Sequence, residues 1–286
     1  MTALLLGVGA AVGWGIADYA GGLASRRIPA LWTSIGMQLI GTTLYAVALL
    51  VLGRWPTVEP DLLPWAVALG TLGALSLLLL YRALALGPIA VVSPVVAAYT
   101  TVTVILIVTF LGERLTLGEA GAIALTFAGV VLASTDLRGI RSLARRRLPG
   151  VPVAFVAMLG FGVWGALMTA ATREQDQVAL ILVGRIVGFV VLVAVAAVIR
   201  SGVQAGSPGT LALVTVVGAF DTIANVLFVS GVAGGEAALV VTGSGLYPVL
   251  PAFLAIVLLG ERLALNQYAG VATLVGGLIA LGVQRG

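Results

Sequence analysis

Residues 136–149 read DLRGIRSLARRRLP and divide this chain of 286 residues close to its midpoint. They form the longest polar break in a sequence that is 60% hydrophobic, and they hold five of its fifteen basic residues. The five are Arg138, Arg141, Arg145, Arg146 and Arg147. Basic loops beside membrane spans are retained in the cytoplasm, so this linker predicts the orientation of the whole chain. A solvated basic linker with no further role is the plain alternative.

The composition places the chain in a membrane. Charged residues make up 9% of it, whereas a soluble domain has about 25%. The net charge of +4 does not indicate nucleic-acid binding, because the arginines lie in loops that flank apolar runs. The chain has no Cys and no His, so it lacks thiolate chemistry and the commonest metal ligand. We therefore expect a polytopic membrane protein with no cofactor and no metal.

Ten apolar segments follow one another along the chain, each close to the 20 or so residues that a membrane-spanning helix needs. Short connections that contain Arg, Pro, Gly or acidic residues separate them. The predicted spans are 2–24, 30–52, 62–86, 89–111, 118–135, 151–171, 178–199, 210–233, 237–259 and 264–283. The predicted fold is all-α, because long helices satisfy their own backbone groups in lipid.

A direct repeat relates the two halves of the chain. The sequence LGERL occurs at residues 111–115 and again at 259–263, an offset of 148. Tyr99 and Tyr247 keep that offset, and Trp14 matches Trp164 at an offset of 150. We expect repeats at 1–135 and 151–286, joined by the linker 136–150. Five spans per half is an odd number, so the second half must enter the membrane upside down, as in transporters with inverted repeats.

These motifs resemble the EamA-type branch of the drug/metabolite transporter superfamily. The resemblance covers the whole chain and rests on the 5+5 duplication, on Gly-Glu-Arg-Leu after each half's fourth span, and on Trp-Gly in each first span. It implies ten helices around a central cavity and transport of a small molecule, without naming the substrate. The family's arginine early in the seventh span is matched by Arg185, whereas Gln38 stands at the corresponding place in the second span.

The orientation follows from an arginine count. Ten arginines lie in the loops after odd-numbered spans, including the linker, and four lie on the opposite side. This places the linker in the cytoplasm of a cell with the protein in its inner membrane. The resemblance implies the reverse orientation for many relatives, and we follow the charges.

Asp221 falls in the middle of the eighth predicted span, with Asn225 one turn later on the same face. A carboxylate at that depth must be paired, hydrated or protonated, so it indicates a coupling or substrate-anchoring residue. The alternative is a structural ion pair with Arg185 in the seventh span. Arg185 is itself deep enough to hold a substrate carboxylate, although the structural role is favoured.

Asp18 lies near the end of the first predicted span, one turn after Trp14. A carboxylate and an indole on one face suit a cationic or amine-bearing substrate. The alternatives are a hydrated carboxylate at the cytoplasmic mouth, or an ion pair with Arg26 or Arg27.

Spans 4 and 9 are the repeat-related pair expected to line the cavity, with Tyr99, Ser244 and Tyr247 facing it. Pro248 and Pro251 lack the N–H that would bond the carbonyls of Ser244 and Tyr247, so two free acceptors are expected there. A plain kink is the alternative. Trp164 and Gln38 join the candidate site as the repeat counterparts of Trp14 and Arg185. Glu236, at the start of span 9, is read as a residue that the helix dipole favours.

The predicted function is secondary active transport of a small polar or cationic metabolite or drug, such as an amino acid or amine, by alternating access. The expected partners are this substrate, protons and the lipid bilayer, with no nucleic acid, and the chain is expected to be a monomer. A passive channel is the first alternative. A membrane-embedded enzyme is the second, and the absence of His and Cys disfavours it.

Overall fold

The structure, a computed structural model, describes residues 2–110, 116–134, 149–204, 206–233, 240, 243–244 and 247–285. Within these ranges every regular element is a helix, which confirms the predicted all-α class. Eight helical segments are long and apolar enough to cross a membrane, and Leu117–Ala133 and Val249–Leu258 are shorter apolar helices. The predicted linker arginines, the first LGERL copy and Glu236 lie outside the described residues.

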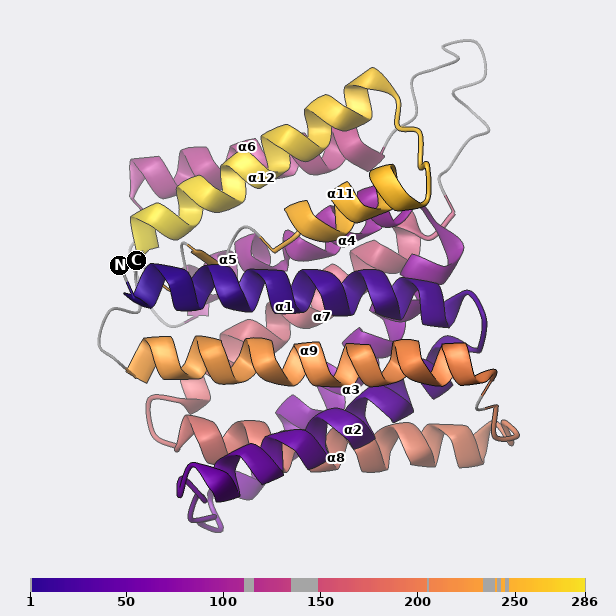
Figure 1. Ribbon diagram of the computed structural model, residues 1–286. Coiled ribbons are helices and arrows are strands. Elements are labelled where there is room, and N and C mark those ends of the chain that lie inside the picture. Colours follow the sequence, from indigo (N-terminus) through magenta and orange to yellow (C-terminus); the bar gives the residue numbers. More distant parts are fainter. Residues whose placement is uncertain are drawn as a thin grey trace.

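The helices of the two halves run in opposite directions. The first half contains α1 (Thr2–Ser25), α2 (Ala30–Val51), α3 (Leu62–Leu86), α4 (Ile89–Ala97), α5 (Tyr99–Phe110) and α6 (Leu117–Ser134). The second contains α7 (Val151–Ala171), α8 (Gln177–Val198), α9 (Pro208–Ala233), α11 (Val249–Leu258) and α12 (Leu265–Arg285). In Figure 1, α1 begins at the end where both termini lie, whereas α7 begins at the other end. We call that other end the linker end.

Local sequence signals explain where the helices begin. Thr116 and Glu119 form a reciprocal capping box at α6: the Thr116 N–H donates to Glu119 Oε2 at 2.6 Å, and the Glu119 N–H donates to Thr116 Oγ1 at 3.2 Å. Gln267 makes half of the same box at α12, where its Oε1 accepts from the Ala264 N–H at 2.8 Å. Because Thr116 and Glu119 match Ala264 and Gln267 at the offset of 148, the repeat extends to the caps.

The fourth predicted span is broken into two helices. The predicted span is confirmed as a candidate membrane span over Ile89–Phe110, but α4 ends at Ala97 and α5 begins at Tyr99, so the span contains a break. Pro94 lies inside α4 and has no N–H to donate to Ala90, which weakens the ladder just before the break. All nine residues of α4 are buried, so this break lies in the interior of the protein.

The prolines of span 9 act differently from the prediction. Pro248 is the N-cap residue of α11 and Pro251 falls in its first turn, where a missing N–H leaves no intrahelical bond unmade. The carbonyl of Ser244 accepts the Tyr247 N–H at 3.0 Å, so the expectation of a free acceptor at Ser244 is wrong. Pro248 and Pro251 therefore stand at the beginning of α11.

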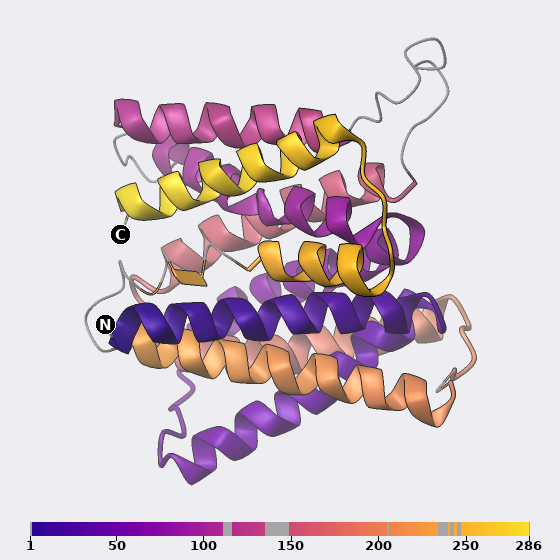
Figure 2. The same cartoon turned by 45° about the horizontal axis from the view of Figure 1, so that its top comes forward.

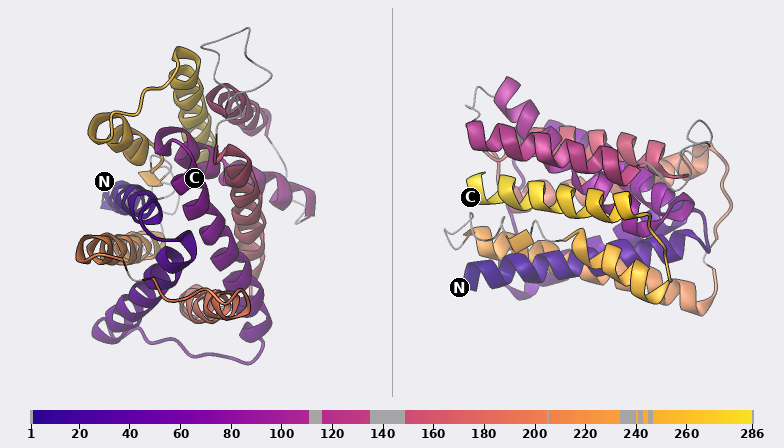
Figure 3. Two further views of the ribbon diagram at one scale, coloured as in Figure 1. Left: turned by 90° about the vertical axis from the view of Figure 1, so that its right-hand side faces the viewer. Right: turned by 90° about the horizontal axis from the view of Figure 1, so that it is seen from above.

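The two halves interleave through close helix pairs. α1 lies along α9, where a Cβ on Gly13 would come within 2.8 Å of the Ala224 Cβ (Figures 2 and 3). α6 lies along α12, where a Cβ on Gly277 would come within 2.7 Å of the Thr126 nitrogen. Small residues permit this approach of backbones in a membrane, where helix association depends on tight packing. The buried α4 contacts α11 and α7 of the other half.

Candidate functional site

Asp18 is a buried carboxylate that accepts a hydrogen bond from a hydroxyl group. Asp18 lies on α1, and 9% of its surface is exposed to solvent. Its Oδ2 accepts a hydrogen bond from Ser93 Oγ on α4 at 2.7 Å. Among the described residues, no arginine lies within ion-pair distance of it. The alternative pairing with Arg26 is not formed, because Arg26 bonds Glu261 at 3.1 Å. Asp18 therefore combines burial with the lack of a counter-charge.

Aromatic side chains from both halves pack on and near α1, the helix that carries Asp18. The Trp14 ring meets the Tyr247 ring edge-on, with centroids 6.3 Å apart, and lies 5.6 Å from the ring of Phe228. Tyr99 packs on Phe161 at 5.8 Å. Tyr99 and Tyr247 both pack against the buried core that includes Ala17, the residue before Asp18 on α1. The structure thus brings together Trp14, Asp18, Tyr99 and Tyr247, which we call the Asp18 cluster, and Ser244 is buried on the same span as Tyr247.

Arg185 and Asp221 form an ion pair between α8 and α9, which is the structural alternative considered for Asp221. Their side chains are 10% and 15% exposed. The guanidinium carbon of Arg185 also lies 5.8 Å from the centre of the Tyr45 ring, a cation–π contact that adds to the pair. Asn225 donates to the backbone carbonyl of Asp221 at 2.7 Å, so its amide is engaged along its own helix.

Two glycines make room for polar side chains around the Arg185–Asp221 pair. We call Arg185, Asp221, Tyr45 and Gln38 the Arg185 cluster. A Cβ on Gly41 of α2 would lie 2.7 Å from Arg185 Nη1, and a Cβ on Gly188 of α8 would lie 2.7 Å from Gln38 Nε2. Gln38 is buried, with 7% of its surface exposed. Arg185 Nη1 is buried and, within the described part of the chain, has no hydrogen-bond partner. The pair consequently keeps one unused donor.

The repeat is asymmetric at this position. Gly73 is the counterpart of Asp221, and a Cβ there would lie 3.1 Å from Trp164 Nε1. Trp164 packs with Trp65, Leu167 and Met168 around a separate apolar cluster between α3, α7 and α8. The structure therefore places Trp164 against α3, apart from the ring contacts of Trp14 and Tyr247. At the position of Asp221, the second half has a carboxylate and the first half has a glycine.

Sequence reasoning does not single out Tyr45 or Tyr81. Both are 2% exposed. The Tyr45 ring lies 5.8 Å from the guanidinium carbon of Arg185, and Tyr81 packs on α1 at Gly21, three residues after Asp18, where a Cβ would meet the ring carbon Cε1. A tyrosine close to the end of a span is typical of the membrane interface, so the pattern gives no signal for an interior role. The fold therefore places two buried tyrosines beside candidate site residues that sequence reasoning does not associate with them.

No group of three His, Cys, Asp or Glu side chains within metal-binding reach occurs in the described ranges. The chemistry of the site therefore rests on two carboxylates, one guanidinium, hydroxyls and aromatic faces. Such a set suits binding and release of protons and small organic cations.

Comparisons with known proteins agree with this fold. The sequence model of the EamA-like transporter family matches residues 1–135 and again residues 148–283. An uncharacterized protein of Methanocaldococcus jannaschii is 30% identical over 133 residues, which is 46% of this chain and 96% of that protein. That relative therefore has about the length of one half. A solved structure described as "Crystal structure of protein" aligns with a TM-score of 0.66 at 20% identity, over 99% of this chain and 98% of that chain.

Proposed function

Because this chain belongs to the EamA-like transporter family, within the drug/metabolite transporter superfamily, we propose that it is a secondary active transporter of a small amine-bearing metabolite or drug. It works by alternating access, exposing one central site first to one side of the membrane and then to the other. The exchange group in this site is the carboxyl of Asp18.

The environment of Asp18 is the observation that supports this proposal. A buried carboxylate is stable when it is paired, protonated or bound to a cation, and among the described residues Asp18 has one hydrogen-bond partner, the hydroxyl of Ser93. Ser93 stabilises the ionised form without neutralising it. A proton or a substrate ammonium can each supply the missing positive charge, and they compete for the same oxygens.

The aromatic rings around Asp18 favour an organic cation over an inorganic one. Trp14 lies one turn before Asp18 on α1, and its ring meets the ring of Tyr247 edge-on, with centroids 6.3 Å apart. An ammonium group held by a carboxylate gains further attraction from aromatic faces, by about 0.5–2 kcal/mol for each good contact. Neither ring offers the oxygen cage that a hard metal cation prefers.

The Arg185–Asp221 pair has a different role in this proposal. It holds α8 against α9, and the unused Nη1 donor of Arg185 is available to an acceptor group of the substrate. An amine that also carries a carbonyl or carboxyl group then contacts both clusters. Asp221 remains a substrate-anchoring residue in this sense, acting through the arginine that it orients.

Coupling follows from competition at one carboxyl group. When Asp18 faces the side with the higher proton concentration it takes a proton, and when it faces the other side it exchanges that proton for the amine. Because a proton and the amine cannot bind Asp18 at the same time, each transport cycle moves the amine in one direction and a proton in the opposite direction. Transport should therefore depend on pH.

The test is flux in proteoliposomes. A panel of amines and amino acids is first screened for binding by thermal shift, and the best ligand is then used in counterflow and in uptake driven by a pH gradient. We expect counterflow, which a passive channel does not produce, and a dependence of uptake on pH. Asp18→Asn should abolish gradient-driven uptake, because the amide cannot exchange a proton at neutral pH.

Asp61→Asn is the matched control, since Asp61 is exposed in the α2–α3 connection and makes no side-chain cap bond. It should transport like the parent protein. Downhill flux without counterflow would instead favour the channel, and gradient-driven uptake by Asp18→Asn would reject the role of Asp18.

A further inference from the structure

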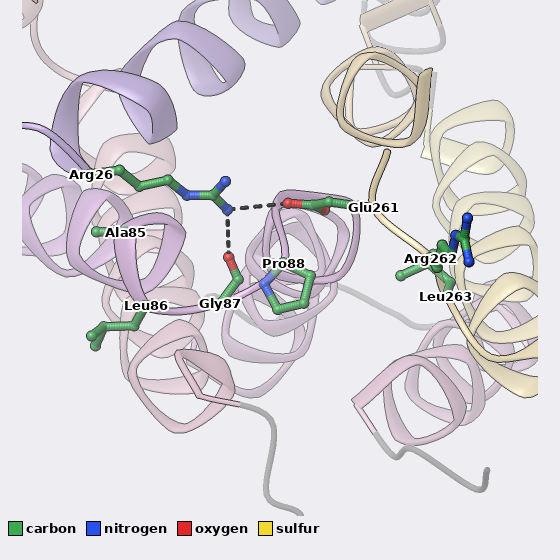
Figure 4. A pocket seen from close by; sticks show the side chains of 8 residues that line it. All are labelled: Arg26, Ala85, Leu86, Gly87, Pro88, Glu261, Arg262 and Leu263. Carbon is green, nitrogen blue, oxygen red and sulfur yellow. Dashed lines mark hydrogen bonds and ion pairs between the residues drawn. The ribbon is translucent and has the colours of Figure 1, made fainter. Parts of the chain in front are cut away.

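A second ion pair joins the two repeats at the linker end. Arg26, directly after α1, donates from Nη2 to Glu261 Oε1 at 3.1 Å (Figure 4). Glu261 lies in the connection between α11 and α12, so this contact joins chain segments 235 residues apart. Arg26 also donates to the carbonyls of Leu84 at 3.3 Å and Gly87 at 2.9 Å, at the end of α3.

The carboxylate of Glu261 also caps a helix of the other half. Its Oε1 accepts the Ile89 N–H at 3.1 Å and its Oε2 accepts the Ala90 N–H at 3.0 Å. These are the first N–H groups of α4, which have no partner within their own helix, and a carboxylate there is favoured by the helix dipole. Ile89 and Ala90 are fully buried, so water does not replace Glu261 in this state.

This contact differs from an ordinary surface salt bridge. Exposed pairs of long side chains contribute little, because both partners are mobile and solvated. Here the Glu261 side chain is 13% exposed and two of its three partners are backbone donors held rigidly by α4. Charge-assisted bonds of this kind are the stronger ones. We call Arg26, Glu261 and the first turn of α4 the linker-end latch.

The latch lies at the linker end of α1 and α4, the two helices that carry Asp18 and Ser93. Between Asp18 and Arg26, α1 packs directly on its neighbours: Gly21 contacts the Tyr81 ring, and a Cβ on Gly22 would lie 2.7 Å from Ile89 Cδ1. The hydroxyl that bonds Asp18 belongs to Ser93, one turn beyond the latch on α4. An opening that moves the α11–α12 connection away from α4 would break the contacts of Glu261 with α4 and Arg26.

We propose that Glu261 is the release point of a gate that holds the linker end closed, an inference that rests on the alternating access proposed above. In the closed state the Glu261 carboxylate, which belongs to the second half, accepts hydrogen bonds from Ile89, Ala90 and Arg26 of the first half. When the linker end opens, the α11–α12 connection withdraws, and water takes over the N–H groups of Ile89 and Ala90. Weakening the latch shifts the population toward the open state without any change at Asp18.

Cysteine labelling tests this, because the chain has no cysteine of its own. Ser93→Cys is an isosteric reporter that is fully buried in the closed state. It is labelled with a membrane-impermeant maleimide in sealed vesicles of both orientations. A separate Ser142→Cys variant identifies the vesicles that present the linker outward. Glu261→Gln and Arg26→Gln weaken the latch, and Arg27→Gln is the control, with the same charge change one residue away from it.

We expect Glu261→Gln and Arg26→Gln to accelerate labelling from the linker side by about tenfold or more, as loss of charge-assisted bonds implies, while Arg27→Gln has no effect. Unchanged labelling in both latch variants would overturn the proposal, as would equal acceleration from both sides, which indicates general loosening. If Glu261→Gln does not fold, Arg26→Gln decides by the same criteria, since it leaves the α4 cap in place. Labelling needs no substrate, so it tests the gate independently of the proposed transport activity.

Discussion

Asp18 and Asp221 are two buried aspartates in opposite electrostatic environments. Asp18 has a hydroxyl partner, whereas Asp221 has a guanidinium. Removing charge from each should therefore have opposite effects on stability. Removing the charge of Asp18 removes a buried charge that has no counter-charge nearby among the described residues. Removing the charge of Asp221 leaves the Arg185 guanidinium without its counter-charge.

We predict that Asp221→Asn lowers the free energy of unfolding by about 3–5 kcal/mol, the usual cost of a buried charge left without its partner. Asp18→Asn should leave it unchanged or raise it. Unfolding of the purified protein in detergent by heat or denaturant measures both. The double variant Asp221→Asn with Arg185→Gln should be less destabilised than the sum of its single variants. An unchanged unfolding midpoint in Asp221→Asn would show that the pair contributes nothing to stability.

At the residue scale, sequence reasoning can find the intramembrane charges but not their partners. Asp18, Arg185 and Asp221 stand out because charged residues are rare in apolar segments. Their pairing depends on which spans are neighbours, and spacing along one helix carries no such information. The sequence alone therefore leaves the ion pair as one of two alternatives, and it gives no signal that Tyr81 packs on α1 near Asp18.

Helix packing through glycine is the main feature at the element scale. Gly277 of α12 faces α6, where a Cβ would lie 2.7 Å from the Thr126 nitrogen, while its neighbour Gly276 has open space around it. We predict that Gly277→Ala lowers the unfolding temperature and weakens the α6–α12 pair. Gly276→Ala should be neutral or stabilising by up to about 1 kcal/mol, because alanine favours a helix more than glycine does.

Thermal unfolding of the two variants side by side checks this prediction. The two substitutions add the same methyl group to adjacent residues, so any difference reports the contact with α6. Equal unfolding temperatures would contradict the close approach of the two helices.

Most helix ends are predictable, because Pro, Gly and Arg mark them. The first three predicted spans agree with α1, α2 and α3 to within one residue at each end. The break between α4 and α5 is not predictable from its apolar sequence, because Pro94 and the packing around a buried helix act together there. The prolines of span 9 are misread for the related reason that their effect depends on where the helix begins.

At the scale of the whole molecule, the opposite directions of α1 and α7 place the connections after α1, α3, α8 and α11 at one end, with both termini at the other (Figure 1). Arg26, Arg27, Arg82, Arg200 and Arg262 belong to that linker end. The division into 1–135, the linker 136–150 and 151–286 remains a prediction, as does the central cavity.

We predict that the linker end is cytoplasmic, because basic residues concentrate there. The linker residues lie outside the described part of the chain, but a cysteine at Ser142 reports their side of the membrane. In intact cells Ser142→Cys should resist an impermeant maleimide and react after permeabilisation. Labelling in intact cells would place the linker outside and reverse the orientation.

The central claim is that Asp18 exchanges a proton for an amine, and calorimetric titration of the purified protein tests it most directly. Binding heats measured in buffers of different ionisation enthalpy give the number of protons released per bound amine. The parent protein and the Asp61→Asn control should release protons when the amine binds, in a number that rises toward one per amine as the pH falls, because a single carboxyl group releases at most the proton that it carries. Asp18→Asn should bind more weakly and release none. Equal proton release in Asp18→Asn, or amine binding to the parent protein without proton release, would contradict the account.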